Sequence, residues 1–305
     1  MGQYLNNFTV ESDLQDGGAN HKDLVVAYTD AHRTGTSGMR VPLTFHHALS
    51  QIAVRIKKGN GFETGRKVRV KGAWIMNVHS TGNLEFDLKA PNNMRWSTST
   101  PANYGRLQAN GTALGEGDGL SIISNDEGGG NSTLMVLPQR FIKYQFPNSS
   151  STVVDDVDLK DVPNYNNAGT YILILCRVET EHFFPLDGTE NTAVGEIDGG
   201  HVHQLFPVVK DASGQLVYDQ NAYGYSCVPI EGNWEPGKKY IYTLEFCGKN
   251  SGAGVYPPDD LPDDLPKGED RPGDKKPGDP VLDSPITFKV EVSDWSEQTE
   301  TTPMP

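Results

Sequence analysis

The sequence predicts an all-β protein, most specifically an antiparallel β-sandwich. Apolar and polar residues alternate at period two in several stretches, as in strands that bury one face. No window of about 11 to 18 residues shows the spacing of an amphipathic helix. The 33 glycines and 20 prolines among 305 residues divide the chain into short segments joined by turns. Because no crossover helices are predicted, the strands should pair mostly antiparallel.

The stretch 286–293 (ITFKVEVS) alternates most clearly. Its apolar residues share one face and its polar residues share the other. The apolar set is Ile286, Phe288, Val290 and Val292. This pattern predicts a strand with one dry side and one wet side.

Two further stretches, 239–246 and 67–78, repeat the alternation. Because Trp74 falls in the apolar set of the second stretch, we expect it in the core rather than on a sugar-stacking surface. The inward sets are Tyr240, Tyr242, Leu244 and Phe246 in the first stretch and Val68, Val70, Trp74, Met76 and Val78 in the second. Weaker alternation predicts strands at 23–29, 84–88, 132–137, 171–178 and 202–209.

The stretch 41–57 changes its inward parity. Its apolar residues Val41, Leu43 and Phe45 hold odd positions, whereas Ile52, Val54 and Ile56 hold even ones. A regular strand cannot change parity, so we expect one long, bent strand with a bulge or kink near residues 48–51. A hairpin is the alternative, but the local sequence HHALS lacks the Gly or Asn of a tight turn.

The charge of the chain excludes one class of partner. With 26 basic and 40 acidic residues, its formal charge is −14. The negative electrostatic field of such a chain repels phosphate backbones and anionic membrane surfaces, so nucleic acid is not expected as a partner. Only 36% of the residues are hydrophobic, and no run of about 20 apolar residues predicts a membrane span.

Residues 251–283 form an acidic segment rich in proline and glycine. Nine carboxylates against four cations give this segment a net charge of −5. It has almost nothing apolar to bury and should not offset its ordering entropy, so we predict an extended, mobile loop between the last two strands. Calcium binding is less favoured, because prolines separate the carboxylates.

The three cysteines are sparse and odd in number. Cys176, Cys227 and Cys247 have no CxxC spacing, which excludes a disulfide-dense scaffold and a four-thiolate zinc site. Cys176 lies in an apolar run and should be a buried small hydrophobe. Whether Cys227 and Cys247 pair is left open.

The histidines offer one weak metal-binding pattern. His46 and His47 are adjacent, so on a strand they point to opposite faces and cannot chelate one metal. His201 and His203 would share a face and would suit a metal if a third ligand came from elsewhere. The sequence offers three such ligands but does not fix them in space: Glu181, His182 and Asp198. A lone His-x-His pair is usually exposed, so we predict no metal site.

No catalytic motif is present in the sequence. The segment 115–119 (GEGDG) lacks G-x-G-x-x-G spacing and opens no helix, and no G-x-S-x-G elbow occurs. The segment 155–158 (DDVD) lacks the Gly and Glu of an EF-hand loop. We therefore predict that the protein is not an enzyme and has no catalytic, cofactor-binding or metal-binding residues and no cofactor.

Several segments match one known family in their order along the chain. They are 23–27 (DLVVA), 41–56 (VPLTFHHALSQIAVRI), 137–139 (LPQ), 234–246 (WEPGKKYIYTLEF) and 286–295 (ITFKVEVSDW). Each match is weak alone, but the ordered set closely resembles the fimbrillin-like proteins of the Bacteroidota, the type V pilins and their Mfa-like relatives.

The resemblance implies a fold and a role. It implies transthyretin-like β-sandwich domains in a secreted lipoprotein that is anchored at the outer membrane or built into cell-surface fimbriae. The role is a structural or accessory subunit (stalk, tip or anchor) in pilus assembly and cell adhesion. Its partners would be other fimbrial subunits, bound by β-strand addition or strand exchange, and host or bacterial surface ligands or glycans. The candidate contact strand carries Ile286, Phe288, Val290 and Val292; alternatively, this strand completes its own sandwich.

The resemblance also implies a domain division. Only 22 residues precede Asp23, fewer than the family implies, and neither a signal nor a lipobox is visible. We therefore expect a two-domain architecture with an incomplete first domain: residues 1–38 as its remnant and 39–305 as the carboxy-terminal sandwich. The resemblance does not explain the acidic segment.

Two other functions remain as alternatives. A non-polymerising surface lipoprotein that binds glycans would present an exposed aromatic pair beside polar loops. A metal-dependent enzyme would be built around His201 and His203.

Overall fold

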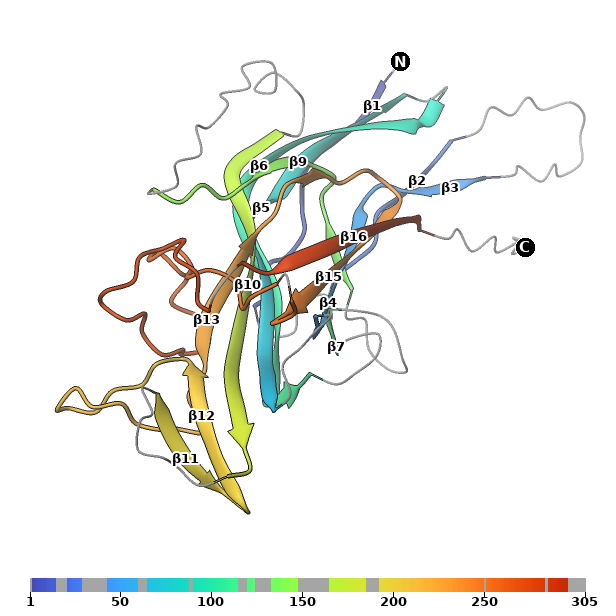
Figure 1. The fold of residues 1–305 in the computed structure, drawn as a ribbon. Helices are drawn as coiled ribbons and strands as arrows, with labels where there is room; N and C mark the ends of the chain where they lie inside the picture. The colour runs from blue at the N-terminus through green and yellow to red at the C-terminus, as the bar shows by residue number, and fades with distance from the viewer. Residues whose placement is uncertain are drawn as a thin grey trace, which may run out of the picture.

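The computed structural model describes residues 2–14, 21–28, 43–59, 65–87, 90–114, 120–123, 133–147, 165–184, 192–249, 251–282 and 285–295. Every regular element in these ranges is a strand, which confirms the all-β prediction. Two sheets form a sandwich, and a two-stranded ribbon projects from it (Figure 1). Within the described ranges, no helix has the length and apolar character needed to cross a membrane.

The larger sheet has nine strands, and its main path runs β1-β5-β10-β12-β11. Strands β6 and β13 pair with β5 and β10, and β9 joins β14 to β10. All its pairs are antiparallel except β9 with β10. The strands are β1 (Gly2–Thr9), β5 (Arg66–Asp87), β6 (Ala90–Ala113), β9 (Arg140–Lys143), β10 (Tyr165–His182), β11 (Ala193–Ile197), β12 (Gly200–Phe206), β13 (Gly224–Pro229) and β14 (Gly232–Asn233).

The smaller sheet has five strands in the order β16-β15-β4-β7, with β8 also paired to β4. Strands β15 and β4 run parallel, whereas β15 and β16 run antiparallel. The strands are β4 (Ser50–Lys58), β7 (Leu120–Ile123), β8 (Leu134–Val136), β15 (Lys238–Phe246) and β16 (Thr287–Asp294). The separate ribbon consists of β2 (Val25–Ala27) and β3 (Phe45–His47).

The main hydrophobic core, here called the inner core, lies between the two sheets. Alternate residues of the facing strands fill it, as expected for a sandwich. Its fully buried members include Ile52, Val54 and Ile56 of β4, Tyr242 and Leu244 of β15, Val68, Val70 and Ile75 of β5, and Ile172 and Ile174 of β10.

A second cluster, here called the outer core, covers the opposite face of the larger sheet. It was not predicted, because a sandwich sheet usually leaves this face to solvent. Leu14, Leu261 and Leu265 pack against it from two other segments of the chain. Its buried members are Trp74, Met76, Tyr171, Leu173, Leu175, Cys227 and Val255.

The outer core corrects the predicted faces of β5. Trp74 is fully buried, as expected, but it does not share a face with Val70. A register shift between Val70 and Gly72 turns Trp74 and Met76 to the outer core, while Ile75 points into the inner core. This bulge reverses the inward parity only as far as a second register shift, between Ile75 and Val78, after which Val78 points into the inner core as predicted.

The prediction that the acidic segment 251–283 is an extended loop with almost nothing to bury is wrong. Its described part folds back on β13, where Val255 and Cys227 exchange two backbone hydrogen bonds of 2.8 and 3.1 Å. Tyr256 is buried in the inner core, and Leu261 packs on the outer core. In Figure 1 this segment lies beside β13, on the side away from the smaller sheet. Its few apolar side chains therefore find partners in both cores.

The predicted bent strand 41–57 is interrupted where the parity changes. Strand β3 ends at His47 and β4 begins at Ser50, so the kink falls within the predicted 48–51. The prediction that Leu43 and Phe45 face inward is wrong, since both are exposed, and Val41 lies outside the described residues. The reason is that β3 leaves the sandwich and pairs with β2 in the ribbon.

Strand β1 lies within the range 1–38, which is predicted to be a domain remnant. It pairs with β5 from Gly2 opposite Asp87 to Thr9 opposite Thr81, and the following Val10 joins the inner core. The division at residue 38 stays a prediction.

All three cysteines are buried thiols. Burial raises the pKa of Cys176 and of Cys227, so both are neutral at physiological pH. Cys227 belongs to the outer core and Cys247 to the inner core, on opposite faces of the larger sheet, so they do not pair.

Candidate functional site

Strand β16, the predicted subunit contact, forms one edge of the smaller sheet. Eight residue pairs join it to β15, from Glu245 opposite Thr287 to Lys238 opposite Asp294. Among the described strands, β15 is its only partner. The other edge of β16 therefore presents backbone N–H and C=O groups that no described strand satisfies.

The apolar face of β16 is covered at one end and open at the other. Val290 and Val292 lie opposite Tyr242 and Tyr240, so all four side chains share one face. The two tyrosines are 2% and 6% exposed, whereas Val290 and Val292 are 40% and 56% exposed. The larger sheet therefore covers β15 but stops short of this half of β16.

The start of β16 is anchored in the inner core. Ile286 is buried, and Phe288 packs against the core with its ring 6.3 Å from that of Tyr242. Thr287 N–H donates a 2.8 Å hydrogen bond to Oγ of Ser251. In the isolated chain, this half of the strand completes its own sheet.

The end of β16 is held by side chains from the ribbon and from β15. Trp295 stacks on His47, and the Trp295 N–H donates a 2.8 Å hydrogen bond to the carbonyl of Gly237. Asp294 pairs with Lys238 of β15. Of the four predicted contact residues, three lie on β16 and Ile286 immediately precedes it. Ile286 is buried and Phe288 is partly buried, whereas Val290 and Val292 are exposed.

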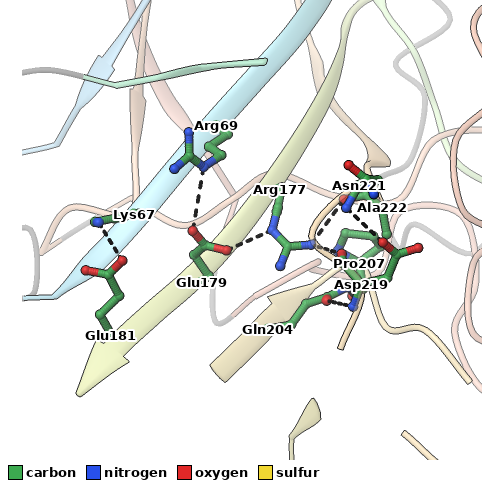
Figure 2. Close-up of polar contacts among 10 residues, drawn as sticks. All are labelled: Lys67, Arg69, Arg177, Glu179, Glu181, Gln204, Pro207, Asp219, Asn221 and Ala222. Atoms are coloured by element: carbon green, nitrogen blue, oxygen red, sulfur yellow. Dashed lines mark hydrogen bonds and ion pairs between the residues drawn. The ribbon is translucent and has the colours of Figure 1, made fainter. Parts of the chain in front are cut away.

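A second feature is a charged row on the outer face of the larger sheet (Figure 2). Lys67 Nζ lies 2.5 Å from Oε1 of Glu181, and Arg69 Nε lies 3.6 Å from Oε1 of Glu179. Arg177 Nε donates a 2.8 Å hydrogen bond to Oε2 of Glu179. These contacts join Arg69, Glu179 and Arg177 into one network across β5 and β10, and the Lys67–Glu181 pair lies beside it.

Arg177 is the buried centre of this network. It is 1% exposed, and Nη1 donates to the carbonyl oxygens of Asp219 and Ala222. The guanidinium also lies over the ring of Tyr218, 5.0 Å from its centroid. Within the described residues, Nη2 is buried with no hydrogen-bond partner. Gln204 fixes the same loop, since its Oε1 accepts a 2.9 Å hydrogen bond from the N–H of Asp219.

A hollow of about 490 Å³ lies over this network. Two tyrosine rings and two amides line it beside the charged groups, and Lys71 Nζ lies 5.2 Å from the ring centroid of Tyr223. Burial raises the pKa of Tyr223, so its hydroxyl stays protonated at physiological pH. The lining residues are Arg69, Lys71, Arg177, Glu179, Tyr218, Gln220, Asn221 and Tyr223.

This hollow is not predicted by any sequence motif. One signal was available: Arg177 follows five apolar residues and Cys176 in a strand that is otherwise buried, and a buried charge needs partners. Glu179, two residues along the same strand, is one partner. The others come from the loop 218–223, and nothing in the sequence places this loop over β10.

The structure also brings together three histidines. His182 at the end of β10 joins His201 and His203 of β12, and their ligand atoms lie within 4.8 Å of one another. No metal site was predicted here, because the sequence alone does not place a third ligand beside the His-x-His pair. His46 lies elsewhere, in the ribbon, and Asp198 is absent from this cluster.

A comparison of the sequence with protein families matches residues 3–172 to a family described as fimbrillin-like. This match covers more than half of the chain. A comparison with curated proteins finds no match.

Solved structures of several proteins from Bacteroides and Parabacteroides species show a distant likeness to this chain. A fimbrial protein from Bacteroides vulgatus is 12% identical, with a TM-score of 0.39 over 83% of this chain and 56% of that one. A candidate cell adhesion protein from Parabacteroides distasonis is 13% identical, with a TM-score of 0.35 over 85% and 55%. Another from Bacteroides uniformis is 13% identical, with a TM-score of 0.28 over 84% and 54%. The chain spans about half the length of these three proteins.

Proposed function

The chain belongs to the fimbrillin-like family, and we propose that it is a structural or accessory subunit of a cell-surface fimbria that contacts its neighbours along β16. The observation that carries this proposal is the difference in exposure along one sheet face. Val290 and Val292 are exposed beside two buried tyrosines of β15. The role is structural rather than catalytic.

Strand addition at this edge would satisfy two needs at once. A strand from a neighbouring subunit would pair with the free backbone groups of β16, which gives affinity without requiring a particular sequence. Its apolar side chains would cover Val290 and Val292, which gives register because side chains alternate at period two. The anchors Ile286 and Phe288 keep β16 in place while its other half is contacted.

Electron microscopy of cells that express the gene for this protein tests this function. The test variant is the double substitution Val290→Ser with Val292→Ser. The matched control is Lys289→Ser with Glu291→Ser, which changes the opposite face of the same strand. We expect fibres that contain the chain to be lost or shortened in the test variant and retained in the control. If both variants are folded and displayed and their fibres are equal in number and length, the proposed contact is contradicted.

The hollow over Arg177 favours a second candidate function, the binding of acidic glycans. Tyr218 and Tyr223 offer ring surfaces, Gln220 and Asn221 offer amides, and buried Nη2 of Arg177 has no partner among the described residues. Aromatic rings with a few polar groups are typical of sugar sites.

Binding of the purified chain to immobilised glycans that contain uronic or sialic acid tests this candidate. Tyr223→Ala should remove such binding, whereas Tyr4→Ala, at an exposed tyrosine of β1, should leave it unchanged. If no acidic glycan is retained by the wild-type chain, this second candidate is wrong and the fimbrial proposal is unaffected.

A further inference from the structure

Three histidines share one face at the far end of the larger sheet. His182 of β10 lies directly opposite His201 of β12 in the ladder, and His203 lies two residues along β12 on the same face. The ring centroids of His201 and His203 are 4.8 Å apart. The ring centroid of His182 lies 5.3 Å from that of His201 and 4.8 Å from that of His203. The register of two paired strands, rather than a flexible loop, therefore sets the cluster.

His201 has an unusual environment for a buried polar group. It is 3% exposed, and among the described residues neither Nδ1 nor Nε2 has a hydrogen-bond partner. Buried polar groups are nearly always satisfied, so such a group needs an explanation. A metal ion bound by one of its nitrogens would supply the missing partner.

The other two rings are held in place by neighbours. His203 Nδ1 lies 2.7 Å from Oγ1 of Thr192, which orients the ring. A polar group on the nitrogen that does not bind the metal is the usual arrangement around a metal-binding histidine. The ring of His182 stacks on that of Phe184, with centroids 4.9 Å apart and planes 19° apart.

We propose that His182, His201 and His203 bind one divalent transition-metal cation of the zinc type. Imidazole nitrogens suit Zn²⁺ and its neighbours in the first transition row, whereas Ca²⁺ and Mg²⁺ require oxygen ligands. In a tetrahedral site with Zn–N bonds of about 2.05 Å, the nitrogens lie roughly 3.3 Å apart. Ligand atoms within 4.8 Å of one another reach that spacing by small rotations of the rings.

A fourth ligand is available on the same face. Glu196 of β11 lies opposite His201 in the β11–β12 ladder, so a row of three side chains crosses three strands. Its carboxylate is exposed and can either reach the metal or leave that position to solvent. The bound ion would join β10 to β12 beyond the register shift between Val178 and Glu179 and would stabilise that end of the sheet.

Titration with ZnCl₂ alone tests the site, using the untagged chain after treatment with a chelator. We expect calorimetry to give one zinc per chain with a dissociation constant of about 1 µM or lower. His203→Gln and His201→Gln should each weaken binding by at least about tenfold. His46→Gln is the control, because it removes one histidine from the ribbon and leaves the cluster intact. Zinc should also raise the Tm of the wild type and of His46→Gln, but not that of His203→Gln.

Two results would overturn the proposal. One is a wild-type chain that binds less than one zinc under these conditions. The other is a His203→Gln chain that binds zinc as tightly as His46→Gln. Because His203 is only partly buried, this variant should keep the native circular dichroism spectrum, so the test stands even if His201→Gln fails to fold.

Discussion

His47 and Trp295 stack face to face, with ring centroids 3.9 Å apart and ring planes within 5° of parallel. His47 Nδ1 donates a 2.7 Å hydrogen bond to Oδ2 of Asp23, which holds the imidazole in position. Asp23 and His47 both belong to the segments that resemble the fimbrillin hallmark, and Trp295 immediately follows β16. The ribbon β2–β3 therefore supports the end of the candidate contact strand.

This relationship predicts the effect of removing the indole. Trp295→Ala removes the stacking and exposes the imidazole, so it should lower the free energy of unfolding by about 2 kcal/mol. Urea denaturation followed by circular dichroism measures the change. Phe183→Ala is the control, since Phe183 is 68% exposed and its loss should change stability by less than about 0.5 kcal/mol. Equal effects of the two substitutions would show that the stacking does not stabilise the fold.

The packed state of the acidic segment predicts that Arg271 protects it from proteolysis. Arg271 Nη2 donates a 2.6 Å hydrogen bond to Oδ1 of Asp259, and Nε donates a 2.9 Å bond to the carbonyl of Lys275. Arg271→Gln removes the ion pair, so the segment should open more often and be cleaved roughly tenfold faster by a limiting protease. Lys267→Gln, an exposed cation of the same segment, should leave the cleavage rate unchanged. Equal cleavage rates would contradict the role of Arg271.

The outer core predicts that Gly105 cannot carry a side chain. A Cβ at Gly105 would lie 2.0 Å from Cδ1 of Trp74 and 2.5 Å from the carbonyl oxygen of Ala73. Gly105→Ala should therefore lower the free energy of unfolding by about 3 kcal/mol through overpacking. Gly273→Ala is the control, because a Cβ there meets nothing within 4 Å. A Gly105→Ala protein as stable as this control would mean that Trp74 does not occupy the described position.

The environment of His21 predicts a pH dependence of stability. Nε2–H donates a 2.9 Å hydrogen bond to the carbonyl of Glu11, and Nδ1 accepts a 3.0 Å bond from the N–H of Met135, so the folded state holds the neutral ring. Burial lowers the pKa of His21 and also that of His79. The unfolded chain, with an ordinary pKa of about 6.5, therefore takes up protons first as the pH falls.

It follows that the free energy of unfolding should decrease as the pH falls through about 6.5 toward the lower folded values. Urea denaturation at several pH values measures this slope. His21→Gln keeps a donor and an acceptor but cannot titrate, so its slope should be smaller than that of the wild type. If the free energy of unfolding of His21→Gln has the same slope against pH as that of the wild type, the pH dependence comes from other groups.

The sequence was sufficient for the fold class and for strands with regular alternation. Residues 240–246 and 286–292 alternate without interruption, and β15 and β16 lie where they were expected. The kink before Ser50 was also visible, because a change of parity requires one. Strand β6 was missed because Pro101 and many polar residues hide its alternation, which an edge strand tolerates.

The sequence could not show which core each side chain of β5 faces, or that the acidic segment packs on the sheet. Both depend on contacts between residues that are distant in the sequence. The bulge at Gly72 that turns Trp74 outward has no local signal beyond one glycine. In the sequence, Val255 and Leu261 are isolated among polar and acidic residues. In the structure, both pack in the outer core with Trp74. The three-histidine cluster likewise depends on the register between β10 and β12, which brings His182 opposite His201.

The most direct test of the proposed subunit contact is hydrogen–deuterium exchange of β16 in the isolated chain and in fimbriae that contain it. The account predicts slower exchange of the amides of residues 287–294 in the fimbria, because a neighbouring strand pairs with the free edge. Strand β11 is the internal control, since it ends the path of the larger sheet and should exchange alike in both states. Equal exchange of residues 287–294 in the two states, with slowing elsewhere in the chain, would contradict the central claim.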